Sequence, residues 1–518
     1  MNNTVKRVTT TLKIMFSNGT NYTIPCVNSH DSQNPDLSNY ATDCKLKLNL
    51  YKGTNTNVIG NIAGSTLSIT GKSIDKLLLP SNESSTYYGL MNNTARIEVK
   101  VTGDDNVETN KGVYYVDSWE CGASSSDYDT FNITCVDLMS KIKGISLTKV
   151  RLKLQMKFSE YLKKIIDTLN TNLPSDMQII YSIANLEKMD ELYSANWSMN
   201  YNNIDRDTVE NVFNELSQNT LSYIWIDGNR TLHVDSLLNE EETGVCNLSG
   251  LVNLFSYSSQ QGDICDYSGI QVEYIETMDY QDQELLNMSD VQVYKGPNTI
   301  TSQLNSDKAI KINVIEVTTD DVTKKAVCTG FSNYKNSIDM NIQASDDCVC
   351  NIKVYGTVVN EAYNTLTRYK DDNNKNSLLE IKNKILRAED IPTFVYNYLR
   401  LISMKNSLVE VEGYINPQLK LSDTVSMVGS RLGISSYYKV IGLEFSLTTN
   451  YRCTATLMKT IEGELSVEVL LINDHAEVRD ILKADIDTIY QFFNATAEQE
   501  VLINKYIGTE LAELQEFM

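Results

Sequence analysis

The chain has 518 residues, of which 42% are hydrophobic, and its formal net charge is −22 because 67 acidic residues outnumber 45 basic ones. This length exceeds what one hydrophobic core supports, so we expect roughly three to five domains. The apolar content excludes a disordered chain, and the acidic surplus argues against general nucleic-acid binding, which depends on Lys and Arg neutralising phosphates.

The sequence contains no apolar run of about 18 residues, the length that a membrane-spanning helix needs. The residues after Met1 are polar and lead directly into an alternating segment, with no apolar core of a signal peptide. We therefore expect neither a membrane-spanning segment nor a secretory signal.

Residues 1–147 are predicted to be all-β. Apolar and polar residues alternate with the period of two that is typical of half-buried strands, and clusters of Gly, Asn and Asp separate the alternating segments. The predicted strands lie at 46–50, 66–70, 95–101, 112–120 and 130–136. Many short, evenly spaced strands favour a β-barrel or a sandwich, and we predict a first β-barrel here.

Residues 148–240 are predicted to form a mixed α/β domain. Phe158, Leu162 and Ile166 belong to an amphipathic stripe that ends before Pro174. After a predicted strand at 177–183, Asp207 and Glu210 have the spacing of a capping box and open a second helix. An Asp-Gly turn at 227–228, between alternating segments at 223–226 and 231–234, predicts a β-hairpin.

Two further segments lead to the C-terminal half. Residues 241–345 are predicted to be an α+β or all-β insertion, and the sequence leaves their role open. Residues 346–465 are predicted to form a strand, a helix pair whose second helix opens at Asp390 and Pro392, and a closing β-barrel. In that barrel a strand breaks at Asn416-Pro417, because proline fixes φ and lacks an amide donor, and a strand pair follows at 437–445 and 451–457.

Residues 466–518 are predicted to form a helical hairpin with an apolar face. That face packs either on its own chain or on another protein. The candidate interface residues on it are Ile486, Ile489, Phe493, Val501 and Leu511.

The sequence gives little support to an enzyme. The three histidines, His30, His233 and His475, lie far apart, and no phosphate-binding loop, HExxH or GxSxG motif is present. The ten cysteines include no CxxC pair. A carboxylate pair, Glu410 and Glu412, shares one strand face, but such pairs are expected on solvated faces of an acidic chain. We predict no catalytic residues, no metal and no cofactor.

Three segments of the sequence resemble the tail hub, or baseplate hub, proteins of bacteriophages. The phrase GYINPQLKLSDTV, followed by YYKVIGLEFSLTTNYRCTATL, resembles the closing barrel of that family, with Ser422 where the family usually has glycine. The phrases GVYYVDSWE and FNITCVDLMSKIKG resemble the last strands and exit helix of the first barrel. The phrase DTVENVFNELSQNTLSYIWIDGNRTLHV resembles the helix-then-hairpin unit.

The resemblance implies a mainly β protein with α+β parts: two β-barrel domains flank mixed α/β domains, and a C-terminal helical hairpin follows. It implies a homotrimeric ring that joins the tail tube, or a distal tail protein, to the spike or tip and contacts the tape-measure protein. DNA would pass through without specific binding. The protein would be assembled in the bacterial host cytoplasm and reside in the virion tail tip or baseplate. The alternatives left open are a tail-associated cell-wall hydrolase and a receptor-binding tail tip module.

Overall fold

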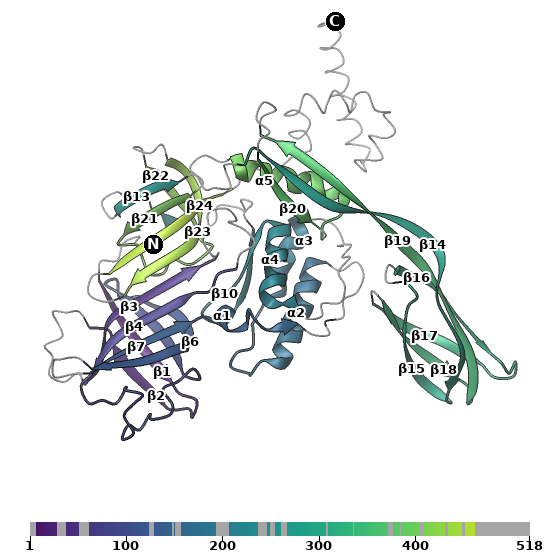
Figure 1. Ribbon diagram of the computed structural model, residues 1–518, viewed down its shortest axis with the longest axis horizontal. Coiled ribbons are helices and arrows are strands. Elements are labelled where there is room, and N and C mark those ends of the chain that lie inside the picture. Colours follow the sequence, from purple (N-terminus) through teal and green to yellow (C-terminus); the bar gives the residue numbers. More distant parts are fainter. Residues whose placement is uncertain are drawn as a thin grey trace, which may run out of the picture. The chain divides into compact units, whose positions relative to one another are not determined.

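In the computed structural model the chain divides into two units, residues 1–461 and 462–518, and the described elements, which Figure 1 labels, all lie in the first. The predicted helical hairpin and its candidate interface residues Ile486, Ile489, Phe493, Val501 and Leu511 lie outside the described residues. The structure describes residues 7–27, 38–50, 62–123, 129–147, 150, 157–192, 207–236, 246–248, 254–260, 267–306, 309–334, 336–370, 377–383, 385–403, 408–429, 434–447 and 451–460.

The largest element is a 13-stranded sheet that contains strands from both ends of the first unit. Its main path runs in the order β13-β21-β24-β23-β3-β4-β7-β6-β5-β1-β2, while β22 pairs with β12 and β23. The strands are β1 (Val8–Met15), β2 (Asn21–Pro25), β3 (Asn39–Asn49), β4 (Thr66–Ser73), β5 (Arg96–Gly103), β6 (Glu108–Ala123), β7 (Asp129–Val136), β12 (Cys246–Asn247), β13 (Leu254–Gln260), β21 (Leu408–Gly413), β22 (Thr424–Gly429), β23 (Ile434–Ser446) and β24 (Arg452–Lys459).

The alternation in the sequence accounts for these strands. On β5, for example, Ile97, Val99 and Val101 are fully buried, whereas the residues between them are partly exposed. Such strands bury one face in a shared core and leave the other face toward water. The predicted N-terminal and C-terminal strands are confirmed as strands.

The N-terminal and C-terminal strands meet along β3 and β23. These two strands pair antiparallel from Gly442 opposite Asn49 to Ser446 opposite Lys45. Backbone hydrogen bonds extend the pairing at both ends: Leu50 N donates to Ile441 O (2.9 Å), and Leu447 N donates to Cys44 O (2.8 Å). We call this pairing the β3–β23 seam.

Helices and a hairpin pack beside the large sheet in sequence order. The elements are α1 (Leu138–Ile142), β8 (Ser146–Leu147), α2 (Phe158–Asn172), α3 (Ile183–Leu192), β9 (Asp207–Thr208), α4 (Val209–Thr220), β10 (Ser222–Ile226) and β11 (Leu232–Ser236). The two predicted helices and the hairpin are confirmed as α2, α4 and β10–β11. Their apolar stripes contribute to the same core as the large sheet.

Two local expectations in this region differ from the structure. The N-cap of α4 is Thr208 rather than Asp207, because the Thr208 hydroxyl accepts the hydrogen bond from the Asn211 amide (3.3 Å). The segment predicted as a strand at 177–183 forms only a parallel bridge, between Ile180 and Thr231, and α3 begins at Ile183. Ile180 pairs with one residue only, Thr231, and a single bridge is too short to form a regular strand.

The segment that the sequence left open forms strands with a second core. It consists of β14 (Gly269–Val293), β15 (Gly296–Gln303), β16 (Ala309–Thr319), β17 (Ala326–Asn333) and β18 (Ser337–Ala344). They are followed by β19 (Cys348–Tyr369), β20 (Leu378–Asn383), a 3-10 turn (Ala388–Asp390) and α5 (Ile391–Ser403). Of the predicted helix pair, the described residues therefore contain only the second helix, α5, because strands precede it. One sheet has the order β16-β19-β14-β20 and another the order β15-β18-β17. Buried residues between positions 285 and 354 form a core that is separate from the main one.

The prediction of a mainly β fold with α+β parts is confirmed. The main path of the large sheet runs open from β13 to β2 in the part of the chain that the structure describes. Among those same residues, no helix is long and apolar enough to cross a membrane.

The turn before β22 contains a residue in an unfavourable backbone conformation. Ser422 has φ +67°, the left-handed region, and its buried hydroxyl has no hydrogen-bond partner in the described residues. Its amide donates to Val440 O (2.8 Å), which fixes the conformation. Glycine adopts this region without steric cost.

We therefore predict that Ser422→Gly raises the free energy of unfolding by about 1 kcal/mol, since an L-residue in this region costs about 1–2 kcal/mol. The midpoint of urea unfolding measures the change. Ser422→Val is the control and should lower the midpoint, because a β-branched side chain tolerates positive φ least. A lower midpoint for Ser422→Gly would contradict the assigned backbone conformation.

Candidate functional site

The residues singled out for possible chemistry do not form a reactive centre in the described part of the chain. His233 stacks on Trp225 (4.4 Å between ring centroids), and its Nε2 lies 3.2 Å from Asp227 Oδ2, whereas His30 and His475 lie outside the described residues. No group of three or more His, Cys, Asp or Glu side chains able to hold a metal occurs in the described ranges.

The carboxylate pair of the hydrolase hypothesis lies on β21. Glu412 forms an ion pair with Arg452 of the neighbouring strand β24 (3.1 Å), and Glu410 is exposed. A cross-strand ion pair of this kind stabilises a sheet surface weakly. It explains an acidic residue at position 412 without a catalytic role.

The three segments that carry the sequence resemblance meet in one place. Gly112 of β6 has φ +104° and lies against Gly228, the glycine of the hairpin turn. A Cβ atom on Gly112 would lie 2.3 Å from Gly228 Cα, and one on Gly228 would lie 2.6 Å from Gly112 Cα. The amide of Val113 donates to Gly228 O (2.9 Å). The two glycines are therefore required because two backbones approach closely.

Lys111, the residue before Gly112, connects β6 to the Asn416-Pro417 turn. Its side chain is buried, and its Nζ donates to Pro417 O and lies 3.5 Å from Leu419 O. The Nζ atom also lies 4.0 Å from the centroid of the Phe445 ring on β23. A buried ammonium needs such partners, because removing it from water is costly. Burial lowers the pKa of Lys111 to about 8.

Both turns at this junction are held by their own side chains. In the Asp-Gly turn, Asp227 Oδ1 accepts hydrogen bonds from the amides of Asn229 and Thr231, each at 2.8 Å. Burial opposes ionisation of Asp227, but hydrogen bonds from His233 and from these amides outweigh it, and the pKa of Asp227 is lowered. In the Asn-Pro turn, Asn416 Oδ1 accepts from the amide of Gln418 (2.8 Å).

A second set of contacts links the hairpin to the C-terminal strands. Lys439 of β23 is also buried, and its Nζ donates to Ser236 O at the end of β11 (2.5 Å). The Tyr223 hydroxyl of β10 lies 3.2 Å from Met458 Sδ of β24. The two buried lysines thus each bind a backbone carbonyl of a segment distant in sequence. We call these contacts, together with those of Lys111, Gly112 and Gly228, the three-way junction.

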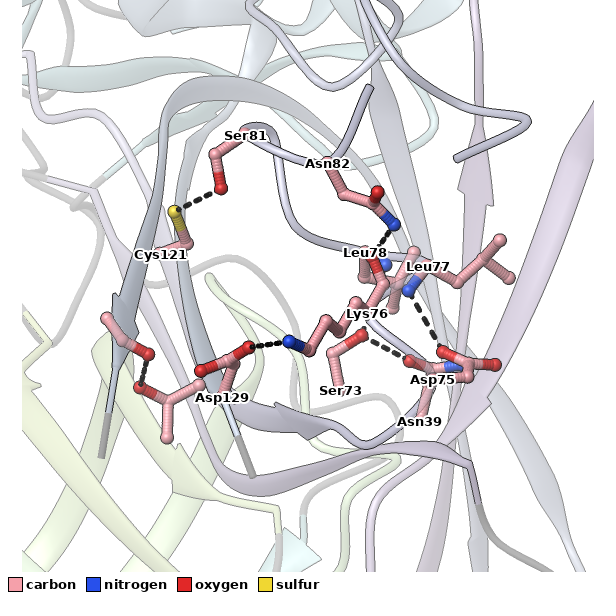
Figure 2. Close-up of polar contacts among 12 residues, drawn as sticks. Asn39, Ser73, Asp75, Lys76, Leu77, Leu78, Ser81, Asn82, Cys121 and Asp129 are labelled. Atoms are coloured by element: carbon pink, nitrogen blue, oxygen red, sulfur yellow. Dashed lines mark hydrogen bonds and ion pairs between the residues drawn. The ribbon is translucent and has the colours of Figure 1, made fainter. Parts of the chain in front are cut away.

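A separate polar cluster holds the long connection between β4 and β5. Asn39 Nδ2 donates to Asp75 Oδ2 (2.9 Å), while Ser73 donates to Asn39 Oδ1 (2.5 Å) and accepts from the Leu78 amide (3.1 Å). Figure 2 shows these contacts beside the ion pair of Lys76 with Asp129 (3.6 Å). Asn39 and Ser73 are buried, so this cluster fixes where the connection leaves the sheet.

The two buried lysines were missed by sequence reasoning. Each is a lone lysine in an alternating strand, where exposure is the usual outcome. The only local signal for Lys111 is its place directly before the glycine of a resemblance-carrying phrase. Its partners lie more than 300 positions away, at Pro417 and Leu419, and the sequence does not show that pairing.

Several solved structures of tail proteins match the chain. The 43 kDa tail protein of prophage MuSo2 from Shewanella oneidensis has 10% identity and a TM-score of 0.45, covering 87% of this chain and 98% of that one. A tail protein from Neisseria meningitidis MC58 has 7% identity and a TM-score of 0.45, covering 87% and 96%. Prophage tail protein gp18 from Listeria monocytogenes EGD-e has 9% identity and a TM-score of 0.39, covering 92% and 99%.

No protein-family model matches the chain, and no curated protein matches it. The three solved structures named above are all tail proteins. Because their TM-scores are below 0.5, we argue the function from the residues and geometry of this chain.

The buried ammonium of Lys111 predicts a specific dependence of stability on pH. Above pH 8 the folded state loses this proton, while the unfolded state keeps it up to its ordinary pKa of 10.5. The unfolded state then binds more protons, so this residue's contribution to the free energy of unfolding rises with pH. Between pH 7 and pH 10 the wild type should gain roughly 2–3 kcal/mol relative to Lys111→Met.

Urea unfolding of both proteins at the two pH values measures this difference. The matched control is Lys47→Met on β3, whose exposed side chain should leave the difference from wild type nearly constant. A constant difference for Lys111→Met would show that Lys111 is hydrated and does not enter the three-way junction as described.

Proposed function

We propose that the protein is a structural subunit of the tail of a phage or phage-derived particle, with no enzymatic activity of its own. Its role would be that of a hub: three copies form a ring that joins the tail tube to the tip or spike and forms part of the DNA-ejection conduit. The observation that carries the proposal is the three-way junction. There Gly112 of one segment that resembles hub proteins lies against Gly228 of a second, and Lys111, directly before Gly112, donates to Pro417 O of the third.

The pairing of the N-terminal strands supports a first barrel as part of this proposal. From β3 the sheet passes through β4, β7, β6, β5 and β1 to β2. Immediately after β2, Cys26 forms a parallel bridge with Ala41 of β3, and the Val27 amide donates to Ala41 O (3.0 Å). This single bridge brings the residue after β2 next to β3, and a contact between the last and first strands of the set is what a barrel would need.

The remaining parts of the proposal follow the predicted organisation. The segments would be a first barrel (1–147), an α/β domain (148–240), an insertion (241–345), a segment with the closing barrel (346–465) and a helical hairpin (466–518). Partners would be a tail tube or distal tail protein, the tape-measure protein and a spike or tip protein. The hairpin would offer Ile486, Ile489, Phe493, Val501 and Leu511 to its own chain or to a neighbour.

The net charge of −22 supports a passive role toward DNA. A conduit lined by acidic or neutral groups lets DNA slide, because phosphates are retained by Lys and Arg. The protein would be assembled in the bacterial host cytoplasm and reside in the virion tail tip or baseplate.

The hydrolase and receptor-binding hypotheses are the alternatives. Glu412 forms an ion pair with Arg452, and this contact accounts for Glu412 without a catalytic role of the Glu410–Glu412 pair. Lysis of bacterial cell walls by the purified protein would favour the hydrolase, and binding of the isolated protein to host cells would favour the receptor-binding module.

We predict that the protein assembles as a homotrimer, because sheet edges of neighbouring barrels can pair and an uncovered edge would promote aggregation. Mass measurement in solution combined with negative-stain imaging should show a particle of three chains with ring-shaped views. A shortened protein of residues 1–461 tests whether the C-terminal residues are needed for the ring. A monomer at every concentration, and also within assembled tails, would contradict the proposed hub.

A further inference from the structure

The long ladder of β14 and β19 connects two separate hydrophobic cores. At one end Ile270 and Val272 are buried in the main core, next to Ile381 of β20. At the other end Leu285 and Val354 are buried in the second core. We call residues 285–354, whose buried side chains form that second core, the arm module.

Between the two cores, exposed side chains occur on both strands of the ladder. All residues from Tyr280 to Glu284 are exposed. Because neighbouring residues of a strand point to opposite faces, both faces of β14 are exposed there. On the partner strand, Tyr363 has 62% of its surface exposed. We call the pairs from Ile275 opposite Tyr363 to Tyr280 opposite Val358 the linker ribbon.

The linker ribbon also lacks a third strand along part of its length. The neighbour on one side, β20, pairs with β14 only up to Tyr274. The neighbour on the other side, β16, pairs with β19 only between Cys350 and Val358. In the described residues, therefore, the pairs from Ile275 opposite Tyr363 to Asp279 opposite Val359 are held by two strands alone. Two-stranded ladders are marginally stable in water.

A β-bulge lies at the end of this two-stranded part. Tyr280 pairs with Val358 and Gln283 with Gly356, so β14 has one residue more than β19 over this step. Asp282, inside the bulge, has φ +56°. Beyond the bulge the packing becomes tight again, because a Cβ on Gly356 would lie 2.2 Å from Lys311 O. Bulges bend strands and interrupt the regular ladder.

From these features we propose that the linker ribbon is a hinge about which the arm module moves as a rigid body. Each end of the ladder is fixed by its own core and by a third strand, whereas the pairs from Ile275 opposite Tyr363 to Asp279 opposite Val359 have no third strand in the described residues. Bending is therefore concentrated in the linker ribbon and at its bulge. This device is independent of the proposed tail function, since it concerns the mechanics of the isolated chain.

The ladder contains a matched pair of sites for testing the hinge. Deleting Asp282 removes the extra residue and joins the pairs on either side in a regular register. Deleting Asp290 does the same to a second bulge, where Met288 pairs with Ile352 and Val291 with Cys350. Asp290 has nearly the same backbone conformation, φ +58°, but lies in the part of the ladder whose side chains form the second core, away from the two-stranded part.

The experiment measures the distance between two spin labels on the full-length protein by pulsed electron paramagnetic resonance. Non-canonical amino acids at Thr365 and Gln343, both exposed, carry the labels and leave the ten native cysteines unmodified. We expect a broad distance distribution in the wild type. Deletion of Asp282 should narrow it about two-fold, and deletion of Asp290 should leave it unchanged.

Hydrogen exchange of the unmodified protein provides a second readout that does not depend on whether the deletion variants fold. Amides of the linker ribbon should exchange at least about ten-fold faster than those of Gly269–Tyr274. Equal protection in the two segments, or a wild-type distribution as narrow as that of two labels within the arm module, would overturn the proposal.

Discussion

The backbone pairing of β3 with β23 is the interaction on which the rest of the main body depends. It joins strands from the first 50 residues to strands from the last 80 described ones and makes them a single sheet. The side chains on both strands then contribute to one core, in which Leu46, Leu443 and Phe445 are buried. Because such distant segments close a long loop, the entropy of loop closure opposes the seam, and the buried apolar area must offset it.

The three-way junction adds directional contacts to this apolar seam. Phe445 lies in the seam itself, and its ring faces the ammonium of Lys111, which in turn binds Pro417 O. Apolar packing alone does not distinguish between similar arrangements of strands. A buried ammonium that requires particular carbonyl acceptors does distinguish between them, because its hydrogen bonds are lost in any other register. We infer that Lys111 and Lys439 contribute to the choice of one arrangement.

The individual strands could be predicted from the sequence, whereas their partners could not. Alternation over 95–101 predicts a half-buried strand, and β5 confirms it, since period-two burial is a local property. The neighbour of β23 is decided by packing over about 400 positions, which no local pattern contains. Ser422 was predictable in part. The sequence resemblance identified it as a departure from glycine, and its positive φ is the physical reason for glycine at that position.

The insertion and the junction were the least predictable parts for different reasons. Residues 280–284 include acidic and polar positions without clear alternation, because their side chains are exposed on both faces of the strand. A strand that is exposed on both faces gives no periodic signal. The candidate site was partly predictable: its two turns were identified by Asp227-Gly228 and Asn416-Pro417, but the lysine that binds the second turn carried no pattern of its own.

Hydrogen exchange measured at increasing urea concentration tests the central claim most directly, which is that the β3–β23 seam makes the two ends of the main body one cooperative unit. Amides of β4 and β7 report on the N-terminal strands, and amides of β21 and β24 report on the C-terminal strands. If the seam unites them, both groups lose protection at the same urea concentration, and Phe445→Ala lowers that concentration for both together. Separate transitions, with the N-terminal strands unaffected by Phe445→Ala, would contradict the account.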